Sequence, residues 1–135
     1  MIKLFPFISI IFAILFSPLV AAEATLELPL WPTNKMPGAG AAAPEKESPA
    51  KGDGVIRLTN VSEPNLTVFR APASTNPAPV VIICPGGGYQ ILAFNKEGTE
   101  IAAWLNTLGI TGIVLKYRVP NNREGALQDL QRAVR

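Results

Sequence analysis

The sequence of 135 residues contains no histidine and a single cysteine. Without histidine, the chain by itself cannot form a Ser-His-Asp triad, because histidine takes the proton of the serine in that arrangement. The pentapeptide G-x-S-x-G, which holds a nucleophilic serine on a sharp strand-to-helix turn, is also absent. One cysteine cannot form a disulfide within the chain. No spacing of carboxylates suggests a metal site, so we expect neither metal nor cofactor.

The charge of the chain is close to balanced, with 12 Lys and Arg residues against 10 Asp and Glu residues. The two signs alternate along the sequence and form no basic cluster of the kind that binds nucleic acid. We therefore expect no nucleic-acid partner. The length allows one domain at most.

The N-terminus has the layout of a secretory signal peptide. Lys3 precedes an almost wholly apolar run over residues 4–20, and small residues suitable for cleavage follow up to Ala24. The alternative is a membrane anchor, but a bilayer span needs about 20 apolar residues, and Pro6 and Pro18 interrupt this run. We expect residues 1–22 to be removed, the product to be secreted or periplasmic, and no stable membrane insertion after cleavage.

The segment at 23–54 is rich in proline, glycine and alanine, above all after Pro37. Such a composition buries little apolar surface, so we expect an extended surface segment or a mobile linker. Residues 55–135 are then expected to carry the hydrophobic core as one folded unit.

Strands and helices alternate in the second half of the chain. Runs of branched and aromatic residues predict strands at 55–59, 66–70, 80–84 and 113–115. Apolar residues at helical spacing predict helices at 97–108 and from about 125 onward, through Ile101, Trp104, Leu105 and Leu108 in the first and Leu127, Leu130 and Val134 in the second. Gly109 is a suitable C-terminal cap. This order predicts an α/β fold with a mostly parallel sheet, helices on both faces and an antiparallel edge formed by the first two strands.

Several polar residues have ordinary interpretations. We expect Lys116, Tyr117 and Arg118 to be a strand end reaching solvent, although a strand end can also place a polar group at a ligand-binding edge. Asp129 and Arg132, three residues apart, predict a solvated ion pair on the second helix. Glu97 and Glu100 look like acids of a first helical turn. Cys84 ends an apolar strand, so we expect a buried hydrophobe rather than a nucleophile.

The motif that suggests chemistry is CPGGGY at positions 84–89. Consecutive glycines after a strand let backbone N–H groups approach a substrate closely. Gly87 and Gly88 are our candidates for the donors of an oxyanion hole, and Tyr89 could add a third N–H or line an acyl pocket. A plain strand-to-helix turn explains the same glycines equally well. Dinucleotide and phosphate-loop motifs do not fit, because G-x-G-x-x-G and G-x-x-x-x-G-K-[ST] are both absent.

Four stretches together resemble a family of secreted bacterial α/β-hydrolases. They are VIICPGGGY at 81–89, EGTEIAAWLN at 97–106, VLKYRVP at 114–120 and LQDLQRAVR at 127–135. The family is the acetyl-xylan or feruloyl esterase type, related to dienelactone hydrolases. The resemblance implies a Ser-His-Asp esterase that acts on acylated carbohydrate or a small ester, with oxyanion donors at Gly87 and Gly88.

The same resemblance implies that residues 55–135 are the N-terminal part of an incomplete α/β-hydrolase domain. The serine, aspartate and histidine would then lie beyond Arg135, and the chain alone would be inactive. Two other functions stay open. One is a secreted, non-catalytic α/β module that binds a carbohydrate or a partner. The other is a related hydrolase acting on peptides or lactones, because a fold does not fix the substrate.

Overall fold

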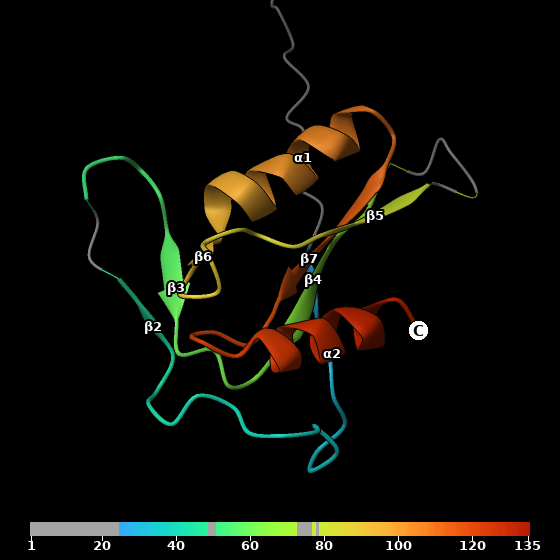
Figure 1. The fold of residues 1–135 in the computed structure, drawn as a ribbon. Coiled ribbons are helices and arrows are strands. Elements are labelled where there is room, and N and C mark those ends of the chain that lie inside the picture. The colour runs from blue at the N-terminus through green and yellow to red at the C-terminus, as the bar shows by residue number, and fades with distance from the viewer. Residues whose placement is uncertain (1–24, 49–50, 73–76, 78) are drawn as a thin grey trace, which may run out of the picture.

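The computed structural model describes residues 25–48, 51–72, 77 and 79–135. The predicted signal peptide lies outside these residues. Two helices lie on opposite sides of a four-stranded sheet, and a smaller three-stranded sheet lies beside it (Figure 1). Neither helix of the described part is long and apolar enough to cross a membrane.

The larger sheet has the order β1–β4–β7–β5, with β1 at Leu26–Pro29, β4 at Asn65–Phe69, β7 at Thr111–Lys116 and β5 at Val80–Ile83. Only β5 and β7 pair in parallel, while β4 is antiparallel to both β1 and β7. The prediction of a mostly parallel sheet is therefore wrong, since two of the three pairings are antiparallel. The prediction of a mixed α/β arrangement with helices on both faces is confirmed.

The smaller sheet corrects a second prediction. It joins β2 (Lys46–Glu47), β3 (Arg57–Thr59) and β6 (Leu92–Ala93), all antiparallel. The two strands expected at 55–59 and 66–70 thus exist as β3 and β4 but lie in different sheets. The reason is Val61, which is fully buried and bridges Val119. The chain between the two strands passes through the core at this residue instead of forming a hairpin turn.

The helix predicted at 97–108 is present as a π-helical turn at Asn95–Thr99 followed by α1 at Glu100–Thr107. It ends as predicted at Gly109, whose φ is +73°. There Ile110 N–H bonds the Leu105 carbonyl and Gly109 N–H bonds that of Asn106, which is a Schellman cap. Its apolar face is narrower than predicted.

Only Ala102 and Leu105 are buried on α1, whereas Ile101, Trp104 and Leu108 are exposed. Ala102 packs directly on β7 at Gly112, where an added Cβ would lie 2.8 Å from that of Ala102. This close approach fixes which face of α1 is covered. Together with Ile83 and Val114, these residues form the core on the α1 side of the sheet.

The second helix, α2, spans Arg123–Ala133. Asn122 caps it by accepting a hydrogen bond from Gly125 N–H at 2.9 Å. Leu130 and Ala126 pack on the core, but Leu127 and Val134 are exposed, contrary to the predicted apolar face. The short side chain of Ala126, not that of Leu127, faces the sheet.

The core includes residues that precede Val55. β1 pairs with β4, and Leu30 is only 5% exposed within the cluster on the α2 side of the sheet. The segment between β1 and β2 then runs alongside α2 (Figure 1), to which Trp31 is hydrogen bonded. The proline- and glycine-rich stretch after it is mostly exposed. Residues 55–135 therefore do not carry the core alone.

Candidate oxyanion site

The glycine loop follows β5 at the end where its parallel neighbour β7 also finishes. Gly87 has a φ of +143°, and an added Cβ would lie 2.1 Å from the Ile91 carbonyl oxygen. Only glycine fits there. Gly88 and Tyr89 have φ values of +62° and +61°, and Gln90 N–H closes the turn on the Gly87 carbonyl at 3.1 Å. Positive φ at both central residues is the signature of a type I′ turn.

This turn presents three backbone donors in succession. Gly86 N–H is bonded to the Glu97 carboxylate at 3.0 Å, and Gln90 N–H is bonded within the turn. No described residue accepts a hydrogen bond from the N–H of Gly87, Gly88 or Tyr89, the three predicted donors. Successive free N–H groups in a turn form a concavity suited to an anion. The structure thus brings the three predicted residues together on one partly exposed turn.

Tyr89 is the strained member of the turn, and its neighbours hold it in place. A non-glycine residue in the left-handed region costs on the order of 1–3 kcal/mol. Asn121 N–H donates to the Tyr89 carbonyl at 2.8 Å, and the Arg123 guanidinium lies 5.2 Å from the centre of its ring. The ring also meets that of Tyr117 edge-on at 6.4 Å. These contacts fix the direction of the Tyr89 peptide.

Tyr117 of the strand end supports the glycine loop through a hydrogen bond, a role that the sequence did not suggest. Its hydroxyl donates a buried hydrogen bond of 2.6 Å to the Pro85 carbonyl. Burial raises the pKa of Tyr117, and Cys84, Tyr89 and Glu97 raise it further. The hydroxyl therefore keeps its proton and remains a donor at neutral pH. Since Tyr117 is 8% exposed, the expectation that this strand end reaches solvent is wrong for it.

Glu97 also belongs to the loop. It lies in the first turn of the π-helical segment, as predicted, and its Oε2 also accepts a hydrogen bond of 3.0 Å from Gly86 N–H. The carbonyl of the same glycine accepts from Ala93 N–H at 2.8 Å. The N–H and the carbonyl of Gly86 are thus both hydrogen bonded. The N–H groups that have no acceptor among the described residues therefore start at Gly87. The other predicted acid, Glu100, lies in the first turn of α1, as predicted, and pairs with Lys96.

Cys84 is exposed, so the prediction of a buried hydrophobe is wrong. Its side chain lines a small, mostly apolar cavity of about 140 Å³ with Tyr89, Tyr117 and Leu127. These surroundings raise the pKa of the Cys84 thiol through loss of solvation. A protonated thiol without an activating base is a weak nucleophile. The expectation that Cys84 is not a nucleophile agrees with this environment.

The strand end also forms a buried ion pair with α2. Arg118 is 1% exposed and Asp129 0%. Their side chains meet at 2.9 Å, and Asp129 also accepts from Trp31 Nε1 at 2.8 Å. Arg118 was expected at a solvated strand end and Asp129 in a solvated pair with Arg132, so both predictions are wrong. The guanidinium also donates hydrogen bonds to the carbonyl oxygens of Pro37 and Gly125, which explains why a charge is tolerated here.

Among the described residues, no group of three His, Cys, Asp or Glu side chains is placed to hold a metal ion. What the site offers is a set of backbone donors on a rigid turn, at the carboxyl end of a parallel strand pair. That combination is typical of α/β proteins that bind an anionic group or a developing negative charge beyond the strand ends.

The comparisons with known proteins agree with an α/β protein of this kind. No family model matches the chain. The chain is 43% identical over 47 residues to an acetylxylan esterase of Xylanibacter ruminicola, which covers 34% of the chain and 10% of that protein. The crystal structure of an acetyl ester-xyloside bifunctional hydrolase from Caldicellulosiruptor lactoaceticus superposes with a TM-score of 0.56 at 28% identity. That match covers 87% of the chain and 36% of the hydrolase.

The chain therefore spans about a third of the hydrolase and a tenth of the esterase. These matches support a relationship to hydrolases of carbohydrate esters, and the fold is consistent with part of an α/β-type hydrolase.

Proposed function

We propose that this chain is the oxyanion-hole part of a serine-type carbohydrate esterase. The observation that carries the proposal is the turn at Gly87, Gly88 and Tyr89, whose N–H groups have no acceptor among the described residues. Preorganised donors of this kind stabilise the negative charge that develops on the carbonyl oxygen of an ester under attack. The names of the two matching proteins support ester hydrolysis on a xylan-type carbohydrate.

The chain supplies donors but not the attacking groups. It contains no histidine, and none of its serines lies in G-x-S-x-G. A Ser-His-Asp mechanism needs a nucleophile and a base that takes its proton. In our proposal both come from outside residues 1–135, so the chain alone does not turn over an ester. We further propose that residues 1–22 direct export and that the substrate is an acylated carbohydrate.

The binding of a small anion tests the turn on the chain itself. Acetate and methylphosphonate place oxygen acceptors of the right size against free N–H groups. We expect a ¹H–¹⁵N NMR titration to move the amide protons of Gly87, Gly88 and Tyr89 downfield together, because each forms a charge-assisted hydrogen bond. The amide of Gly86 should not respond, since it is already bonded to Glu97. Uniform small shifts across the chain would contradict the proposal and favour a non-catalytic module.

A chimera tests catalysis. Residues 25–135 would replace the matching 36% of the Caldicellulosiruptor hydrolase, and kcat for 4-nitrophenyl acetate would be measured. Gly88→Val should lower kcat by about 10²–10³, the usual cost of losing one oxyanion donor. Gly88 faces open space, so the valine acts through the backbone and not through a clash. Gln131→Ala, on the exposed surface of α2, is the matched control and should leave kcat unchanged.

A further inference from the structure

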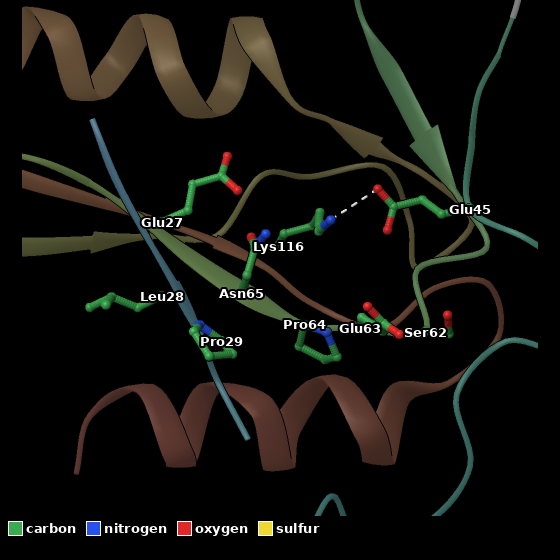
Figure 2. Close-up of a pocket in the computed structure, with 9 residues that line it drawn as sticks. All are labelled: Glu27, Leu28, Pro29, Glu45, Ser62, Glu63, Pro64, Asn65 and Lys116. Atoms are coloured by element: carbon green, nitrogen blue, oxygen red, sulfur yellow. Dashed lines mark hydrogen bonds and ion pairs between the residues drawn. The ribbon is translucent and has the colours of Figure 1, made fainter. Parts of the chain in front are cut away.

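We infer that a groove beside β1 and β4 binds an uncharged sugar unit. The groove has a volume of about 510 Å³ and is lined by residues of β1, the start of β4 and the end of β7 (Figure 2). Nothing in the proposed oxyanion site uses it. The inference goes beyond the proposed function, although the choice of a sugar over other hydroxyl-rich ligands rests on it.

Strand register places the polar residues of the groove on one face. Asn65 lies opposite both Pro29 of β1 and Lys116 of β7, and Glu27 lies opposite Thr67. Side chains two residues apart share a face of a strand, so Glu27, Asn65 and Lys116 all lie on the side of the sheet that carries α1. In Figure 2 the Asn65 carboxamide points into the space between Glu27 and Lys116.

The side-chain oxygen of Asn65 has no hydrogen-bond donor among the described residues, and a ligand could supply one. This Oδ1 atom is buried. Buried polar atoms nearly always have a hydrogen-bond partner. An unpaired acceptor at the base of a groove is satisfied by a hydroxyl or N–H group that enters from outside.

The charges of the groove select against an anion. Glu27 and Glu63 form no ion pair with any described residue. The ammonium group of Lys116 is bound to Glu45 at 3.0 Å, as the dashed line in Figure 2 marks. The polar groups of the groove outside this ion pair include two carboxylates and the Asn65 carboxamide. Their oxygens accept hydrogen bonds, and sugar hydroxyls donate them.

The shape of the groove suits a chain of sugars. Pro29 and Pro64 give it apolar walls against which the C–H face of a sugar ring can pack. A second hollow of about 360 Å³ shares Pro29, Ser62, Glu63 and Pro64 with the first and extends to Trp31. Two adjoining hollows with common walls can accept consecutive units of an oligosaccharide.

The test is an NMR titration of the full chain with unacetylated xylohexaose. We expect saturable shifts at the side-chain amide of Asn65 and at the backbone of Glu27 and Lys116. Asn65→Ala should raise the Kd for xylohexaose by about fivefold to tenfold, as for the loss of one hydrogen bond. Because Asn65 Oδ1 bonds nothing in the protein, this variant should keep the spectrum of a folded chain. Glu124→Gln, an exposed carboxylate on α2, is the matched control and should bind as the parent does.

Three results would overturn the inference. They are no saturable shift with xylohexaose, an unchanged Kd in Asn65→Ala, or binding of spermidine at these residues without binding of xylohexaose, which would mark a cation site. The ligand carries no ester, so the oxyanion turn is not involved in this titration. If xylohexaose binds but acetate does not shift the amide protons of the turn, the sugar-binding groove is supported and the esterase proposal is rejected. If acetate shifts these amide protons but xylohexaose does not bind, only the sugar-binding groove is rejected.

Discussion

Removal of the Asp129 carboxylate should destabilise the chain far more than removal of an exposed charge. Asp129 is fully buried and holds three groups at once: the Arg118 guanidinium, the Arg118 N–H at 3.0 Å and the Trp31 indole N–H at 2.8 Å. In Asp129→Ala the buried guanidinium loses its counterion. Breaking a buried pair from one side costs about 3–5 kcal/mol.

The partly buried Trp31 indole N–H, left without its acceptor, adds some of the cost of a buried unpaired donor to this loss. A buried donor left without an acceptor costs about 1–3 kcal/mol. Domains of ordinary stability unfold with a free energy of about 5–15 kcal/mol. Asp129→Ala should therefore remove a large share of the total and leave a substantial unfolded fraction at room temperature.

Urea unfolding followed by tryptophan fluorescence measures the effect, since Trp31 reports directly on the network. Glu100→Ala is the matched control, because Glu100 forms an exposed pair with Lys96 at 2.9 Å and such pairs contribute at most about 1 kcal/mol. The double variant Arg118→Met with Asp129→Leu should recover much of the loss, because no buried charge remains. If Asp129→Ala and Glu100→Ala lower the free energy of unfolding equally, the reasoning about the buried pair is wrong.

Three further outcomes are expected. Gly87→Ala should abolish the response of the turn to acetate, because its Cβ meets the Ile91 carbonyl, whereas Gly88→Ala should only weaken it; equal effects would reject the steric argument. The sequence has two tyrosines, so absorbance titration of the parent and of Tyr117→Phe isolates Tyr117. Its midpoint should lie above the usual value of about 10, and the free energy of unfolding should fall as the pH rises through that range, because the unfolded chain releases the proton first; a midpoint at or below 10 would contradict this. Val80→Lys should lower the apparent mass in light scattering at high concentration, because Val80 is 57% exposed on the β5 edge and lysine blocks edge-to-edge pairing, while Thr107→Lys on α1 should not; no difference between them would rule out the edge as the contact.

Local patterns predicted much of the fold. The uninterrupted apolar runs give β5 and β7, and the helical spacing gives α1 and α2 with ends near the predicted residues. Partner choice between strands was not predicted, because β3 pairs with β2 and β6 through contacts distant in sequence. The burial of Val61 between β3 and β4 has no local signal that separates it from a turn residue.

The candidate site was predicted in part. The glycines mark the loop because the backbone there needs positive φ and close approach, and both are properties of single residues. Tyr117 and Glu97 were not recognised as its supports, because their roles depend on where β7 and the helix start lie relative to the loop. Arg118 and Asp129 were expected in solvent since charges usually are. Their burial depends on their pairing with each other, which the local sequence does not reveal.

The hydrogen bond between Trp31 and Asp129 joins residues that are 98 positions apart. A ribosome makes the indole early and its acceptor almost a hundred residues later. During that interval Trp31 has no acceptor for its indole N–H, because α2, which carries Asp129, is the last element that the structure describes. Contacts of such long sequence separation slow folding. Trp31 can therefore form this contact only after α2 has been made.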